Sequence, residues 1–184
     1  MKKLIVLLLG LISMQAYAIV MSPGFKAGPI AEKSYTILVY SDLVMTEPEK
    51  NRAQSCDFYL KDKNNVCDIK FIMFQQETKD PVSKQQIGFW SNLVTMNIAE
   101  DQKSIKGMRF FNDSDVAKEF NGDSGLNAFI SGSTSPFLEG HKFAAANFIY
   151  KKDVGIICEV LLFDDHEFTK TEPFMKLFHL FKFN

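Results

Sequence analysis

The sequence predicts a single α+β domain, a mainly antiparallel sheet of about seven or eight strands with a C-terminal amphipathic helix packed on one face. Two apolar, strand-length runs within residues 142–163 flank a short polar connection at 151–153, which is the pattern of an antiparallel hairpin. The second run is apolar at nearly every position, so both of its faces must be covered and it belongs at the centre of the sheet. Apolar residues at helical spacing follow near the C-terminus and predict the helix.

The N-terminus carries the pattern of a secretory signal peptide. Lys2 and Lys3 form its basic start, residues 4–12 its apolar core, and Ala16 and Ala18 the small residues of a cleavage site. The apolar core is about half of the roughly 20 residues that a membrane-spanning helix needs. We therefore expect cleavage after Ala18, a periplasmic or secreted location in a Gram-negative bacterium, and no integral membrane segment in the mature chain.

Removal of residues 1–18 leaves 166 of the 184 residues, which fits one domain with a sizeable core. Residues 19–31 hold two prolines and two glycines without hydrophobic periodicity, and they predict an irregular arm before a domain of residues 32–184. Without the two leader lysines the formal charge of −1 becomes −3, and the remaining basic residues are scattered. This distribution argues against a nucleic acid partner, which requires a basic patch.

Strand patterns occupy the N-terminal part of the domain. Residues 35–44 are rich in β-branched and aromatic side chains and predict the first strand. Residues 56–61 and 66–75 predict a second hairpin. Its turn at 62–65 contains asparagines, which tolerate the positive φ of a tight turn.

The middle of the chain predicts a helix and then a third hairpin. Residues 82–92 follow an Asp-Pro pair, which suits the start of a short helix. Residues 93–99 and 105–111 show apolar spacing with a period of two, and residues 100–104 are the expected turn between these two strands.

Two further helices are expected towards the C-terminus. Residues 113–122 begin with capping side chains and end at a glycine, while residues 132–140 are typical of a loop. The last helix has Thr171 as its cap and Pro173 in its first turn. Its apolar stripe consists of Phe174, Leu177, Phe178 and Phe181.

The densest group of potential acid–base or metal-binding side chains is Asp-Asp-His-Glu at residues 164–167, directly after the central strand. Consecutive side chains on an extended chain point to opposite sides, so at most two of them can address one ion, and no further His or Cys has the spacing of a metal site. We predict no metal and no other cofactor, and interpret the segment as a polar turn. In the alternative, His166 acts with Asp164 and Asp165 in catalysis.

Glu159 is the one ionisable residue in the apolar central strand. A carboxylate there must reach water, pair with a cation or have a raised pKa, and the last two outcomes are typical of functional sites. By alternation Glu159 shares a face with Ile157 and Leu161. We expect this face to be partly open, so that Glu159 points to water.

The three cysteines, Cys56, Cys67 and Cys158, predict one disulfide in an exported chain. We favour Cys56–Cys67, since closing this loop contributes about 3 kcal/mol by chain entropy. A two-residue turn at 64–65, however, places Cys56 opposite Met73 and too far from Cys67 to bond. A wider turn or a Cys67–Cys158 bond would resolve this conflict, although Cys158 is best interpreted as a small buried apolar residue.

Residues 122–125, Gly-Asp-Ser-Gly, resemble the nucleophile motif of the chymotrypsin-like serine peptidases. That family places its His and Asp before the Ser, whereas all three histidines of this chain follow Ser124. We interpret the segment as the turn that ends the preceding helix.

Two function classes remain open from the sequence. The lack of a catalytic motif favours an exported, non-enzymatic binding protein of the bacterial envelope, for example an inhibitor or immunity-type partner of another protein. The alternative is a small periplasmic hydrolase that uses Asp164, Asp165 and His166 with Glu159. The hydrolase requires His166 and these carboxylates to converge in one pocket, which a structure can test.

Overall fold

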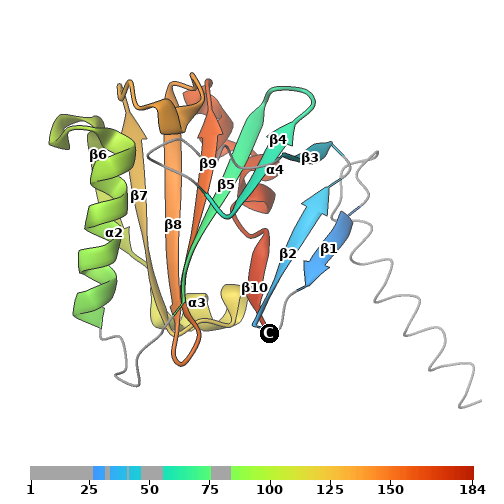
Figure 1. Ribbon diagram of the computed structural model, residues 1–184, viewed down its shortest axis with the longest axis vertical. Helices are drawn as coiled ribbons and strands as arrows, with labels where there is room; N and C mark the ends of the chain where they lie inside the picture. The colour runs from blue at the N-terminus through green and yellow to red at the C-terminus, as the bar shows by residue number, and fades with distance from the viewer. Residues whose placement is uncertain (1–26, 32–33, 41, 47–55, 76–83) are drawn as a thin grey trace, which may run out of the picture.

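The structure, a computed structural model, describes residues 27–31, 34–40, 42–46, 56–75 and 84–184. The signal peptide predicted for residues 1–18 therefore lies outside the described residues. Within them the chain forms ten strands in two antiparallel sheets, which confirms a mainly antiparallel α+β fold (Figure 1).

The larger sheet has seven strands in the order β3-β4-β5-β9-β8-β7-β6. They are β3 (Leu43–Thr46), β4 (Phe58–Asp62), β5 (Cys67–Gln75), β6 (Ile105–Phe110), β7 (Ser124–Ser131), β8 (Phe143–Lys151) and β9 (Gly155–Phe163). The smaller sheet has the order β1-β2-β10. Its strands are β1 (Ala27–Ala31), β2 (Tyr35–Tyr40) and β10 (Phe181–Phe183).

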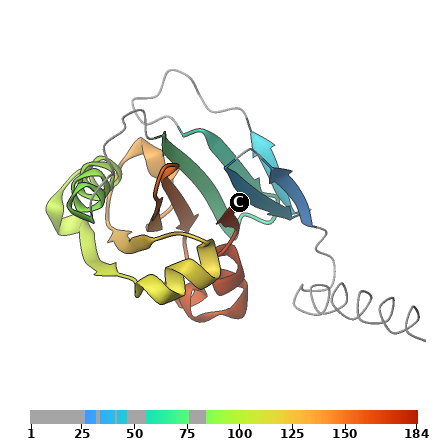
Figure 2. The same cartoon turned by 90° about the horizontal axis from the view of Figure 1, so that it is seen from below.

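Helices cover both faces of the larger sheet (Figure 2). One face packs against α2 (Lys84–Ala99) and the short 3-10 helix η2 (Pro136–Leu138). The other packs against α3 (Asp113–Phe120), α4 (Glu172–Leu177) and the smaller sheet. Two further 3-10 helices, η1 (Gln102–Ser104) and η3 (His166–Lys170), lie in connections.

The hairpin at residues 142–163 is the centre of the larger sheet, as predicted. Strand β9 is the fourth of seven, pairs with β5 and β8, and is buried at all nine residues. The turn before it uses positive φ at Asp153 and Gly155. The continuous apolar run thus predicted the two-sided burial correctly.

The strand predicted for residues 93–99 is wrong, because these residues complete helix α2. The buried side chains described in this helix recur at helical spacing: Ile87, Ser91, Val94, Thr95, Ile98 and Ala99. Leu93 and Met96, which lie within the range predicted as a strand, are 46% and 40% exposed on the outer side of the helix. Seven residues are too few to separate the two periods, so the predicted third hairpin fails, although β6 does form a strand and pairs with β7 instead.

The C-terminal helix is much shorter than predicted. Helix α4 has six residues, and the chain then turns back so that Phe181 belongs to strand β10. Thr171 caps α4 as expected, its hydroxyl oxygen accepting from the Phe174 N–H, and Phe174 is buried against Phe163. The phenylalanines fill the core from a helix, a turn and a strand in succession rather than from one helical face.

Two N-terminal predictions also need correction. Residues 35–44 form two strands, since β2 ends at Tyr40 in the smaller sheet and β3 begins at Leu43 in the larger one. Residues 27–31, expected to belong to an irregular arm, form β1 and pair with β2. Strand β1 is an edge strand. Pro29 lacks a backbone N–H, and this is tolerated at an edge because no further strand has to accept a hydrogen bond from it.

Candidate binding site

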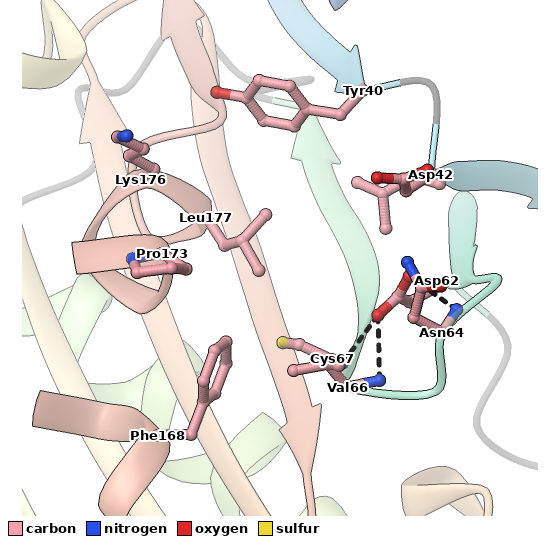
Figure 3. Close-up of a pocket in the computed structure, with 11 residues that line it drawn as sticks. Tyr40, Asp42, Asp62, Asn64, Val66, Cys67, Phe168, Pro173, Lys176 and Leu177 are labelled. Atoms are coloured by element: carbon pink, nitrogen blue, oxygen red, sulfur yellow. Dashed lines mark hydrogen bonds between the residues drawn. The ribbon is translucent and has the colours of Figure 1, made fainter. Parts of the chain in front are cut away.

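A cavity of about 250 Å³ lies between α4 and the β4–β5 hairpin (Figure 3). Pro173 and Leu177 of α4 form one side, while Val66 and Cys67 of the hairpin form the other. Phe168 of η3 closes one end. These side chains come from segments about one hundred residues apart, so no local pattern in the sequence could have indicated the cavity.

The hairpin wall is fixed by one carboxylate. Asp62 is buried and accepts hydrogen bonds from the backbone N–H groups of Asn64, Val66 and Cys67 at 3.0, 2.8 and 3.4 Å. Asn65 has a positive φ of 54°, which confirms the role predicted for the asparagines of this turn. The turn therefore holds the cavity wall in one conformation.

Polar groups surround the other end of the cavity. Tyr40 and Asp42 come from the end of β2 and the residues after it, and Lys176 comes from α4. The Lys176 ammonium pairs with Glu172 at 2.9 Å, one helical turn earlier. Burial, and then the charge of Glu159, raise the pKa of Tyr40, so its hydroxyl remains protonated at neutral pH.

Glu159 is fully buried, so the prediction that it points to water is wrong. Asn147 donates to its Oε2 at 3.2 Å, and Asn127 donates to Asn147 Oδ1 at 2.9 Å, which gives a row of polar side chains across β9, β8 and β7. Among the described residues Glu159 Oε1 has no hydrogen-bond partner. Burial raises the pKa of Glu159 to about 8, although hydrogen bonds with Asn147 and the Leu180 backbone lower it.

The cover over Glu159 is the segment that follows α4. Asn147 also donates to the Phe178 carbonyl at 3.4 Å, and Leu180 is fully buried. The alternation of side chains along the strand gives the correct face for Glu159, which it shares with Ile157 and Leu161. Whether solvent reaches that face depends on the segment after α4, about 20 residues later in the sequence. The periodicity of β9 contains no information about the position of that segment.

A second polar cluster, centred on His141, was not identified from the sequence. His141 Nε2 lies 3.4 Å from Asp68 and its Nδ1 lies 3.1 Å from Asp164. The Tyr59 hydroxyl also donates to Asp68, at 2.7 Å. Hydrogen bonding to Asp68 raises the pKa of His141 against the effect of burial. Burial opposes the ionisation of Asp68, but its hydrogen bonds outweigh this and lower its pKa.

Both aspartates of the predicted polar turn at residues 164–167 make hydrogen bonds within the fold. Asp164 accepts from the Lys142 backbone N–H at 3.0 Å in addition to its contact with His141, and Asp165 accepts from the Glu167 N–H at 2.9 Å as the cap of η3. The side chain of His166 is 55% exposed. The imidazole that meets Asp164 is therefore that of His141 and not that of His166.

Glu159 is also separate from this turn. It lies four residues before the end of β9 at Phe163, which corresponds to roughly 13 Å along an extended strand. It is covered by the segment after α4, whereas His166 stands at the surface against the rings of Phe129 and Phe143. The residues of the proposed hydrolase do not converge in one pocket.

The favoured Cys56–Cys67 disulfide is wrong, since all three cysteines are free and buried. Leu60 pairs with Ile69, and the same register places Cys56 opposite Met73, as the two-residue turn implied. Cys158 pairs with Ile72 and lies in the cluster under α2, on the opposite face of the sheet from Cys67. Neither pairing with Cys67 is therefore possible without rearrangement of the sheet.

The Gly-Asp-Ser-Gly segment does end a helix. Asn121 terminates α3 with a φ of 53°, and Ser124 is the first residue of β7, where it is buried. A Cβ atom at Gly122 or Gly125 would lie 2.7 or 2.6 Å from Ile149 side-chain atoms. Close packing of α3 and β7 on β8 explains both glycines.

Within the described ranges no three His, Cys, Asp or Glu side chains are grouped so that they could hold a metal ion. The same part of the chain contains no helix that is long and apolar enough to cross a bilayer.

Comparison with known proteins identifies the fold alone. No family model matches the sequence, and no curated protein matches it. The solution structure of CyanoP, the cyanobacterial PsbP of Synechocystis, is similar with a TM-score of 0.56 and 8% sequence identity, over 90% of this chain and 95% of that chain. The similarity covers nearly the whole length of both chains, and it indicates a PsbP-like arrangement of sheet and helices.

Proposed function

We propose that this chain is an exported, non-enzymatic binding protein of the bacterial envelope, which holds an apolar side chain of a protein partner in the cavity between α4 and the β4–β5 hairpin. An inhibitor or immunity-type partner of another protein fits this description. The signal-peptide pattern of residues 1–18 supports export. The cavity supports the binding of a partner.

The observation that carries the proposal is the size and lining of the cavity. Its volume of about 250 Å³ is below the roughly 300 to 1,000 Å³ of typical small-molecule sites. Protein interfaces often bury one large side chain in such a pocket, and this anchor supplies much of the affinity. Pro173, Leu177 and Val66 offer the apolar walls that an aromatic or aliphatic anchor requires.

The polar groups around the cavity favour binding over catalysis. The Asp62 carboxylate is engaged by three N–H groups of its own turn, and Lys176 is paired with Glu172. Cys67 is buried, and burial raises the pKa of its thiol, so it is not a thiolate nucleophile at neutral pH. The cavity therefore presents shape and apolar surface rather than a reactive group.

The hydrolase alternative loses its support because its residues have other partners. Asp164 contacts His141 and the Lys142 N–H, and Asp165 caps η3. We therefore retain the binding function.

Site-specific photo-cross-linking tests this function. A photoreactive phenylalanine analogue replaces Leu177, which lines the cavity, or Met175, which is 50% exposed on the same helix and does not line it. We expect cross-linking to one envelope protein from position 177 and none from position 175.

The captured protein is then purified, and its affinity is measured by calorimetry for wild type, Leu177→Glu and Met175→Glu. Thermal unfolding checks that both variants are folded. We expect Leu177→Glu to weaken binding by about tenfold or more and Met175→Glu to have no effect. Equal capture at both positions, or wild-type affinity in folded Leu177→Glu, would refute the proposed site.

A further inference from the structure

In the part of the chain that the structure describes, strand β6 is an edge of the larger sheet with no strand on its outer side. Among the described strands β6 has one neighbour, β7, and it stands at the opposite end of the sheet from β3 and β4. From Lys106 to Phe110 every residue of β6 is exposed. An open edge presents unpaired N–H and C=O groups, which form a template for another strand.

The pairing of β6 with β7 shows which backbone groups point outward. The Phe111 N–H donates to the Gly125 carbonyl at 2.9 Å, and Phe110 stands opposite Leu126 in the same register. In an antiparallel ladder, residues alternate between bonding inward and outward. Arg109 therefore bonds towards β7, whereas Met108 and Phe110 direct their N–H and C=O groups away from the sheet.

The same two residues carry exposed apolar side chains. Met108 is 40% exposed and Phe110 is 63% exposed. They stand opposite Ala128 and Leu126, which belong to the core under α2, so both side chains lie on the α2 face of the sheet. Outward backbone groups and exposed apolar side chains thus coincide at two positions of one edge.

We propose that a second copy of this chain pairs with this edge, β6 against β6, antiparallel and centred on Met108. The two larger sheets then continue into one another through a two-fold axis. The occupant is a second copy because the edge is complementary to itself in this register, as the facing residues show.

A two-fold axis at Met108 sets Met108 against Met108 of the second copy, with mutual hydrogen bonds because its backbone groups point outward. Phe110 then faces Lys106, and Arg109 faces Gly107. No like charges stand opposite each other, although the edge carries two basic residues. The stem of Lys106 covers the Phe110 ring, and the two methionines cover each other.

The β-bulge at Lys106 limits the length of the ladder. Ile105 pairs with Ile130 and Gly107 with Phe129, so one extra residue lies between them. A bulge bends the strand away from a longer pairing. The contact is therefore confined to one short stretch around Met108. The assembly is a closed dimer because a two-fold pairing uses the β6 edge of each copy once.

The cavity between α4 and the β4–β5 hairpin lies towards the other end of the sheet, so pairing through β6 leaves it open in both copies. The inference does not depend on the proposed function. A dimer would present two cavities to a partner.

Light scattering after size exclusion, together with sedimentation equilibrium, measures the mass of the purified chain. We expect a dimer that dissociates on dilution. Met108→Glu places two carboxylates opposite each other and should weaken dimerisation by about tenfold or more. Met45→Glu is the matched control, because Met45 is 48% exposed on β3 at the other edge, and it should leave the dimer unchanged.

Cysteine cross-linking tests the register itself. Residues that face each other in an antiparallel pair have Cα atoms about 5 Å apart, within the range of a disulfide. Met108→Cys should cross-link to a second copy under mild oxidation, and Met45→Cys should not. A monomer at millimolar concentration, or a dimer that persists in Met108→Glu and fails to cross-link through Met108→Cys, would overturn the proposal.

Discussion

Replacement of Glu159 by glutamine should change how the stability of this protein depends on pH. Glu159 is fully buried, its Oε1 has no partner among the described residues, and burial raises its pKa from 4.5 to about 8. In the unfolded chain the same carboxyl ionises near its ordinary pKa. Between these two values the folded state holds a proton that the unfolded state has lost, so rising pH favours unfolding.

The magnitude follows from the two pKa values. Each pH unit between 4.5 and about 8 removes about 1.4 kcal/mol from the free energy of unfolding, or about 5 kcal/mol over the whole interval. Below pH 4.5 the carboxyl is protonated in both states and has no effect. The side chain is inaccessible to water, so solvent screening does not reduce this figure.

Glutamine at position 159 has no proton to lose, so its curve lacks this slope. Its buried amide N–H groups add a cost of about 1–3 kcal/mol, which is the same at every pH and only offsets the curve. Other titrating groups, such as His141 and His179, are common to both proteins. The difference between wild type and Glu159→Gln therefore isolates the carboxyl.

Urea denaturation of both proteins at pH 5, 6, 7 and 8 measures this difference. We expect the stability of Glu159→Gln relative to wild type to increase by about 1.4 kcal/mol for each pH unit. A constant difference from pH 5 to pH 8 would show that Glu159 is ionised or hydrated in the folded protein, and would refute its burial beneath the segment after α4.

Three further predictions concern the His141 cluster, the glycines and the thiols. The pKa of His141 is raised above 6.5, so its contribution to the free energy of unfolding is present below pH 6.5 and is lost as pH rises through the folded pKa. His141→Gln should therefore lower the free energy of unfolding by about 1 kcal/mol at pH 6 and by less at pH 9. Equal losses at the two pH values in urea denaturation would contradict the contact with Asp68. Gly125→Ala should lower stability by about 1–3 kcal/mol, because its Cβ would lie 2.8 Å from the Phe148 carbonyl oxygen. Gly88→Ala in α2 is the control: its Cβ meets nothing within 4 Å, so it should raise stability by up to about 1 kcal/mol. Thermal unfolding should therefore show a lower Tm for Gly125→Ala and a higher Tm for Gly88→Ala. Thiol titration of the denatured chain without reductant should find three free thiols, and a count of one would show that two of the cysteines form a disulfide.

The sequence predicted those elements whose evidence lies within the element. The β8–β9 hairpin was found because nearly every position of its second run is apolar. Helix α3 was predicted from the capping side chains at 113–115 and from Gly122, although its N-cap is Asn112 without a side-chain hydrogen bond and its C-cap is Asn121. Helix α2 was divided wrongly because residues 93–99 fit a period of two over a short window, and the full set of buried positions was needed to reveal the helix. The end of α4 was predicted too late because the position of Phe181 fits the apolar stripe of a helix as well as it fits a strand, and the structure places it in β10.

By itself, the sequence determined the antiparallel α+β class, the central hairpin and the face on which Glu159 lies, while the leader at residues 1–18 stays a prediction. Only the tertiary structure decided that this face is dry, that Asp164 meets His141, that the cysteines lie too far apart to bond, and that a cavity opens beside α4. The physical reason is that alternation along a strand fixes the direction of a side chain through local backbone geometry. What the side chain meets there depends on segments distant in sequence.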